Sequence, residues 1–211
     1  HRCRWWRNHG GSTLEHLLAV LERPGIFMNT VRIIGGEWKR RQLRFPDALG
    51  LRPTPDRVRE TLFNWLGQDL SGRRCLDLFA GSGALGFEAA SRGAERVIMV
   101  EQSPEVVAAL ENNTRLLAAG DRLRIIRGDA VKSAPSFASR EGKFDVLFLD
   151  PPYRQGWLER LEPLLPALLA DDGELYVEAE HQLDRLGDWL TVRQGRAGQV
   201  YYHLMRKGET P

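Results

Sequence analysis

The chain has 211 residues, 42% of them hydrophobic, which is enough to bury a full core in one α/β domain with an appendage. No apolar run approaches the length of a membrane span, and Cys3 and Cys75 show neither disulfide nor metal-ligand spacing. We therefore expect a protein of the reducing cytoplasm, without a membrane role and without a metal.

The net charge of +2 is distributed unevenly along the chain. Residues 32–59 contain eight basic and three acidic residues, whereas residues 60–211 contain 18 basic and 23 acidic residues. A basic segment on a mildly acidic body is typical of a protein that binds a polyanion with one of its parts. A solvated charged surface gives the same pattern, so charge alone leaves both interpretations open.

The N-terminal residues divide into an extension and a basic region. Residues 1–27 do not begin with Met, and we interpret them as an extension, added or translated upstream of a start at Met28; a native N-terminal helix is the alternative. From Met28 to residue 46, alternating apolar and basic residues around Gly35 and Gly36 predict a short hairpin with one basic face. Two strands alone are marginal, so the hairpin should pack on the main domain or on a partner.

A helix that leads into the main domain should follow this hairpin. Thr54 is a plausible N-cap and Pro55 suits the first helical position, and the helix should end near Gly67. Trp38 either stacks on a base or pins the hairpin to the body. We expect the basic N-terminal region, residues 28–70, to contact phosphates through Arg32, Lys39, Arg40, Arg41, Arg52, Thr54, Arg57 and Arg59.

The stretch from Asp77 to Gly86 predicts a strand, a glycine-rich turn and a helix N-terminus in succession. Glycines at 81 and 83 let a ligand lie against the main chain, next to the positive end of the helix dipole. The spacing Gly81-x-Gly83-x-x-Gly86 also matches the dinucleotide fingerprint, but such a match alone is weak. The turn therefore predicts a nucleotide or nucleoside site.

Two acidic positions further along the chain support a nucleoside. Glu101 ends the predicted strand 96–101, where an acid can accept hydrogen bonds from both ribose hydroxyls. The turn at residues 128–130 follows the predicted strand 123–127 and could supply an acceptor for an adenine amino group. Oxidoreductases and methyltransferases share this arrangement, so these positions do not identify the nucleoside.

The tetrapeptide Asp150-Pro151-Pro152-Tyr153 is the most specific signal in the chain. It follows the apolar run 144–149 and would lie at the carboxyl end of a buried strand, where open α/β sheets bind ligands. Two prolines remove two N–H donors, so the carboxylate and the carbonyls form a pocket of acceptors for an –NH2 group. Tyr153 adds a ring against which a base can stack.

With these motifs the sequence resembles the class I S-adenosylmethionine-dependent methyltransferases that methylate amino groups. From Met28 to about Lys207 it more narrowly resembles the bacterial 16S ribosomal RNA guanine-N2 methyltransferases of the RsmD type. The closer resemblance is carried by Arg32–Gly36, Leu51–Pro55 and Arg57–Asn64, and the superfamily by Asp77–Gly83 and Asp150–Tyr153.

The resemblance implies a Rossmann-like fold over residues 71–207, with a seven-stranded, mostly parallel sheet whose last strand is antiparallel. Strands five to seven would be 174–178, 190–194 and 199–206. It implies catalysis by Asp150, Pro151, Pro152 and Tyr153. It implies a site for S-adenosylmethionine, and for the product S-adenosylhomocysteine, made by Asp77, Phe79, Ala80, Gly81, Ser82, Gly83, Glu101, Gln102, Asp129 and Ala130.

The resemblance also implies 16S rRNA as partner, within the 30S subunit or an assembly intermediate, and nothing in the sequence suggests more than a monomer. Three other functions remain open. An amino methyltransferase of adenine N6 or cytosine N4 in DNA would use the same tetrapeptide. A nicotinamide-dependent oxidoreductase would explain the glycines and Glu101 but not the tetrapeptide. A catalytically silent RNA-binding module would not need so complete a set of site residues.

Overall fold

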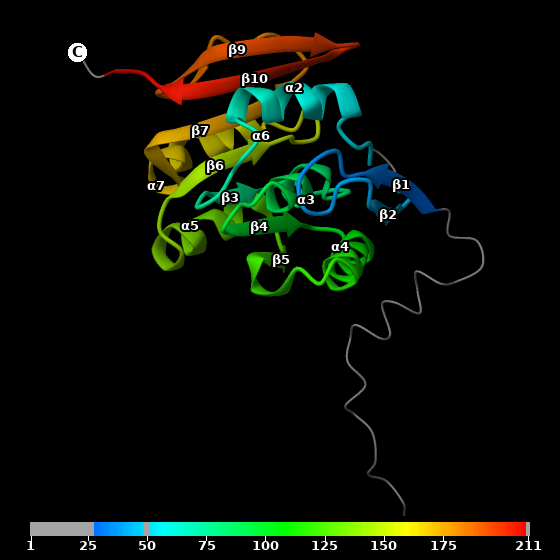
Figure 1. The fold of residues 1–211 in the computed structure, drawn as a ribbon. Coiled ribbons are helices and arrows are strands. Elements are labelled where there is room, and N and C mark those ends of the chain that lie inside the picture. The colour runs from blue at the N-terminus through cyan, green and yellow to red at the C-terminus, as the bar shows by residue number, and fades with distance from the viewer. Residues whose placement is uncertain (1–27, 49–50, 210–211) are drawn as a thin grey trace, which may run out of the picture.

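An eight-stranded sheet runs through the centre of the molecule, with helices on both faces (Figure 1). The computed structural model describes residues 28–48 and 51–209, so the prediction for residues 1–27 lies outside the described residues. The strand order is β5-β4-β3-β6-β7-β10-β9-β8. The strands are β3 (Arg74–Asp77), β4 (Arg96–Glu101), β5 (Leu123–Arg127), β6 (Phe144–Leu149), β7 (Leu169–Ala179), β8 (Arg185–Leu186), β9 (Trp189–Ala197) and β10 (Val200–Lys207).

The first five strands in this order are parallel to one another, and β10 pairs antiparallel with both β7 and β9. This is the predicted α/β class with an antiparallel last strand. The sheet has eight strands where we expected seven. The additional strand is β8, whose two residues pair with the edge strand β9 and are too few to show a hydrophobic pattern.

Two hydrophobic clusters lie on opposite faces of the sheet. One includes buried side chains of the N-terminal hairpin, α2 (Asp56–Leu66), α3 (Ala84–Ser91) and α4 (Pro104–Leu116). The other includes α5 (Ala130–Arg140), α6 (Trp157–Leu161) and α7 (Leu165–Leu168). Strands covered on both faces are apolar throughout, which is why β4 and β6 were predictable as continuous hydrophobic runs. None of the described helices combines the length and the apolarity that a bilayer crossing requires.

The N-terminal hairpin packs on the main domain, as its small size predicted. Its strands, β1 (Met28–Arg32) and β2 (Gln42–Pro46), pair antiparallel and are joined by residues 33–41, a longer connection than expected. The buried carboxylate of Glu88 on α3 accepts hydrogen bonds from the backbone N–H groups of Ile34 and Gly35, at 2.9 and 2.8 Å. Trp38 is buried, so it pins the hairpin to the body and is not available to stack on a base.

The lead-in helix begins later than predicted. Asp56 is the first residue of α2 and Pro55 occupies the N-cap position, without a side-chain capping bond. The expectation that Thr54 caps the helix is wrong, because its hydroxyl donates instead to Glu178 on β7. The helix ends at Leu66 with Gly67 at the C-cap, as the sequence predicted.

Candidate functional site

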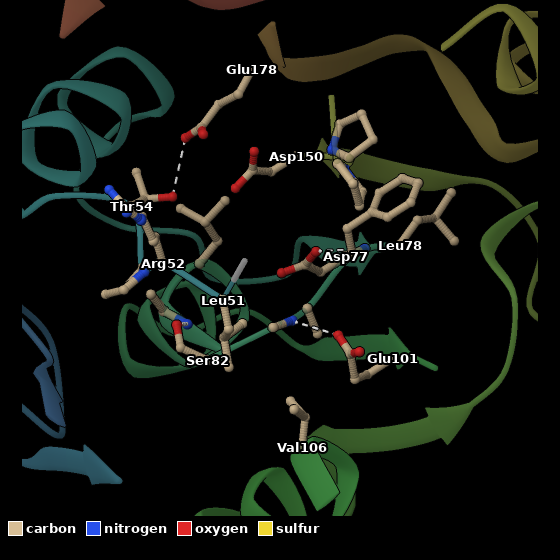
Figure 2. Close-up of a pocket in the computed structure, with 18 of the residues that line it drawn as sticks. Leu51, Arg52, Thr54, Asp77, Leu78, Ser82, Glu101, Val106, Asp150 and Glu178 are labelled. Atoms are coloured by element: carbon tan, nitrogen blue, oxygen red, sulfur yellow. Dashed lines mark hydrogen bonds between the residues drawn. The ribbon is translucent and has the colours of Figure 1, made fainter. Parts of the chain in front are cut away.

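A cavity of about 820 Å³ opens at the carboxyl ends of β3, β4, β6 and β7. This is the edge of an open α/β sheet where ligands bind. Segments distant in sequence enclose it: the loop before α2, the glycine-rich turn, and the ends of the four strands. Figure 2 shows the carboxylates of Asp77 and Asp150 directed into this space, with Glu178 on one side and Glu101 on the other.

The glycine-rich turn joins β3 to α3, as the sequence predicted. Gly81 and Gly83 have φ values of +52° and +82°, in the left-handed region that favours glycine. A Cβ atom on Gly83 would lie 2.4 Å from the ring of Phe87, and one on Gly86 would lie 2.4 Å from the sulfur of Met99. The first two glycines therefore shape the turn at the cavity, whereas Gly86 allows α3 to approach β4.

Glu101 closes the turn from the second strand. Its Oε2 accepts a hydrogen bond from the backbone N–H of Gly81 at 3.0 Å, and its Oε1 accepts from Gln102 and Ser103 at 3.1 and 3.2 Å. These bonds hold the carboxylate at the cavity wall, where the sequence predicted an acceptor for ribose hydroxyls.

Asp77 is the last residue of β3 and is almost completely buried at the base of the cavity. Its Oδ1 accepts a hydrogen bond from the backbone N–H of Phe79 at 3.2 Å. Burial, together with the nearby carboxylates of Glu101 and Glu178 and against that hydrogen bond, raises the pKa of Asp77 to about 7. A cationic ligand in the cavity would stabilise the charged form of Asp77 and lower its pKa.

Asp150 and Glu178 form a pair of neighbouring carboxyl groups. Strands β6 and β7 are parallel, with Leu149 opposite Val177, so the two acids follow at equivalent positions beyond this pair. Burial raises the pKa of Asp150 well above its ordinary value, and so do the charge and hydrogen bond of Glu178. We did not predict Glu178 as a site residue. The sequence feature that could have indicated this role is the acidic residue directly after the buried apolar run Leu175–Val177.

The remaining tetrapeptide residues also line the cavity. Pro151 is buried, while Pro152 is exposed, and Tyr153 is 39% exposed. Burial raises the pKa of Tyr153 to about 12, with a further contribution from Asp150, so the phenol stays protonated at neutral pH. The tyrosine therefore offers a neutral ring near the proposed amino-group site.

Asp129 is predicted, together with Ala130, to contact the adenine. It caps α5, accepting hydrogen bonds from the backbone N–H groups of Val131 and Lys132 at 2.9 Å, and Gln102 donates to its other oxygen at 3.1 Å. Asp129 is not among the described residues that line the cavity, and neither is Gly83. Ala130 and Gln102 line the cavity, and the other predicted cofactor residues that do so are Asp77, Phe79, Ala80, Gly81, Ser82 and Glu101.

The predicted RNA contacts divide into exposed and buried side chains. The exposed ones are Arg32, Lys39, Arg40, Arg41, Arg52 and Arg57. Arg59 is buried, and its guanidinium donates to Glu88, to Asp56 and to the carbonyl oxygens of Arg32 and Thr54. The expectation that Arg59 contacts RNA is therefore wrong. Thr54 is buried and lines the cavity, so it lies at the proposed catalytic site and not on the basic surface.

The cavity has a strongly acidic lining. Among the described residues that line it, four are acidic, Asp77, Glu101, Asp150 and Glu178, and Arg52 is the one basic residue. Such a site favours a ligand with positive charge and with N–H or O–H donors.

Comparisons with known proteins identify relatives of this chain. Residues 31–206 match the family described as "Conserved hypothetical protein 95". The ribosomal RNA small subunit methyltransferase D of Escherichia coli is 44% identical over 183 residues, which cover 84% of the chain and 90% of that protein.

Solved structures give the same result. A candidate methyltransferase of Escherichia coli has 43% identity and a TM-score of 0.74, covering 85% of the chain and 98% of that protein. An RNA methyltransferase of Salinibacter ruber shares the fold at 18% identity and a TM-score of 0.59, covering 76% of the chain and 97% of that protein. The chain belongs to the RsmD family of methyltransferases.

Proposed function

We propose that this protein transfers the methyl group of S-adenosylmethionine to the exocyclic N2 of a guanine in 16S ribosomal RNA. It would act in the cytoplasm as a monomer, on RNA within the 30S subunit or an assembly intermediate. The observation that carries the proposal is the row of four acidic side chains along a cavity that contains the Asp150–Tyr153 tetrapeptide. The names of the methyltransferase D relatives support an rRNA substrate.

The residues present fit S-adenosylmethionine, which carries an ammonium group and a cationic sulfonium from which it supplies a methyl group. Asp77 would hold the ammonium of its methionine moiety beside the backbone of the glycine-rich turn. Glu101 would accept the ribose hydroxyls. A dinucleotide would instead place a pyrophosphate among four carboxylates with only Arg52 as a described basic lining residue, which disfavours the nicotinamide alternative.

The chain's contribution to catalysis is positioning and hydrogen bonding. The lone pair of an exocyclic amino nitrogen is delocalised into the base, so this nitrogen is a poor nucleophile. Asp150 and the carbonyl of Pro151 would accept its two N–H bonds, favour pyramidal geometry and stabilise the positive charge that develops on nitrogen. Tyr153 would hold the ring so that the nitrogen faces the methyl group in line with the breaking bond.

The target base must leave its stack to reach this cavity. The exposed basic residues of the N-terminal region and the loop before α2 would hold the surrounding RNA backbone through phosphate contacts. Arg52 belongs to both regions, because it is exposed and also lines the cavity. In this arrangement the RNA backbone would lie at the entrance of the cavity and the target base inside it.

The test is transfer of a radiolabelled methyl group to 30S subunits, free 16S RNA and duplex DNA, followed by nucleoside analysis. We expect label in N2-methylguanosine from 30S subunits. Label in N6-methyladenine or N4-methylcytosine would refute the guanine assignment, and the absence of label from every nucleic acid would refute the methyltransferase assignment.

A variant then tests the role of Asp150. Asp150→Ala should retain S-adenosylhomocysteine binding in calorimetry and lose methyl transfer, because it removes an acceptor and not the cofactor site. Asp172→Ala, at an exposed position on β7, is the matched control and should keep wild-type turnover. Near wild-type turnover in Asp150→Ala would show that this role is wrong.

A further inference from the structure

A second carboxylate lies beside the one that is proposed to take the amino group. Glu178 is 6% exposed and extends from β7 into the same cavity as Asp150, which directly follows β6 (Figure 2). The parallel register, with Leu149 opposite Val177, places the two acids side by side. One carboxylate suffices to accept an N–H bond from an amino group, so a second one at this position calls for a separate role.

The orientation of Glu178 is set by two protein donors. The hydroxyl of Thr54 donates to its Oε1 at 3.1 Å, and the hydroxyl of Tyr176 donates to the same oxygen at 2.5 Å. Burial and the neighbouring Glu178 raise the pKa of Tyr176, which keeps this phenol protonated as a donor. Both donors use Oε1, which leaves Oε2 for the contact with Asp150 or for a ligand.

The chemistry of the bases indicates what Oε2 could recognise. In guanine, adenine and cytosine the amino group is attached to a carbon that is bonded to a ring nitrogen on the Watson–Crick edge. In guanine this nitrogen is N1–H, a donor, whereas adenine N1 and cytosine N3 are acceptors with a lone pair. A carboxylate beside the amino-group site accepts a hydrogen bond from guanine and repels the other two bases.

We propose that Glu178 selects guanine, by accepting the N1–H of the base whose N2 amino group is held at Asp150. This inference rests on the proposed function and deepens it, because the tetrapeptide alone does not distinguish the three bases. Thr54 and Tyr176 are positioning residues that direct the free oxygen of Glu178 toward the base. Thr54 comes from the loop before α2, which links base selection to the N-terminal region.

A single base analogue tests this role. In 2-aminopurine the 2-amino group is retained and N1 carries no hydrogen. The target guanine, mapped by the nucleoside analysis described above, is replaced by 2-aminopurine in reassembled 30S particles, and kcat/KM is measured for both substrates. Wild-type protein should favour guanine by about ten- to a hundredfold, as expected for the loss of one hydrogen bond to a charged acceptor.

The variant Glu178→Gln should reverse this preference. Its amide oxygen can still accept from Thr54 and Tyr176, so its amide nitrogen replaces Oε2 and donates to the unprotonated N1 of 2-aminopurine. The matched control is Glu180→Gln, the same change at a half-buried glutamate that pairs with the exposed Arg154, which should keep the wild-type ratio. Unchanged S-adenosylhomocysteine affinity would show that the variant is folded.

A wild-type ratio in Glu178→Gln would overturn the inference, and so would an equal loss of activity on both substrates, because either result means that Glu178 does not read N1. The failure of the proposed function looks different, since wild-type protein itself would then not label guanine in normal 30S particles.

Discussion

Asp77 combines a stability cost with a proposed binding role, so Asp77→Asn should separate the two. Burial raises the pKa of Asp77 from 3.8 to about 7. Because the pKa is higher in the folded than in the unfolded protein, the contribution of this carboxyl group to the free energy of unfolding is largest below about pH 4, where it is protonated in both states. That contribution is lost as the pH rises to about 7, and a shift of about three units corresponds to about 4 kcal/mol.

The asparagine side chain does not titrate and can still accept the hydrogen bond from the backbone N–H of Phe79. The free energy of unfolding of ligand-free Asp77→Asn should therefore gain about 2–3 kcal/mol relative to wild type between pH 5 and pH 8. Urea unfolding at both pH values measures this difference. Asp172→Asn on the exposed part of β7 is the matched control and should show no such change.

Binding should change in the opposite direction. At pH 8 the variant should bind S-adenosylhomocysteine at least tenfold more weakly than wild type, because it lacks the charge that pairs with the ligand's ammonium group. Calorimetry should also show wild-type affinity decreasing as the pH falls below about 7. Identical pH profiles of unfolding for the two proteins would refute the raised pKa, and equal affinities would refute the contact with the ligand.

Two further predictions concern the N-terminal region. Glu88→Gln should lower the free energy of unfolding by about 3–5 kcal/mol in urea, because it leaves the buried Arg92 without an acidic partner and the buried Arg59 with only the half-exposed Asp56. The exposed Glu60→Gln is the control, and equal stability of the two variants would contradict this reasoning. Joint replacement of Lys39, Arg40 and Arg41 by Ala should weaken 16S RNA binding and reduce the slope of log affinity against log salt by about 2–3, measured by filter binding. The corresponding replacement of the exposed Lys132, Arg140 and Lys143 should leave that slope unchanged, and equal slopes for both variants would place the RNA elsewhere.

The sequence was informative wherever a property is local. The strands β4, β5 and β6 were predicted with their observed bounds, and β4 and β6 were clear because buried strands appear as nearly continuous apolar runs. The glycine-rich turn was predicted because its left-handed conformations require glycine at specific positions. Glu101 and Asp150 were found because each directly follows or ends such a strand, and parallel strands bring their carboxyl ends to one edge.

Predictions of side-chain roles were less accurate where a distant segment supplies the hydrogen-bond partner. Thr54 has the sequence signature of a helix cap, but its hydroxyl is used by Glu178, which is 124 residues away in the chain. Arg59 is a basic residue in a basic segment and so was predicted to contact phosphates, but its guanidinium donates to the buried Glu88. In both cases a hydrogen bond to a residue distant in the sequence replaced the contact that the local sequence predicted.

What the amino-acid sequence determined by itself was the fold class, the glycine-rich turn and the acidic strand ends, because these depend on local conformation and on hydrophobic runs. Only the tertiary structure decided that Glu178 stands beside Asp150, that Trp38 is buried and that Arg59 is unavailable to RNA. These properties depend on which segments meet across the sheet. A buried carboxylate or guanidinium is stable only where a distant segment supplies its hydrogen-bond partners, and a single sequence does not record those pairings.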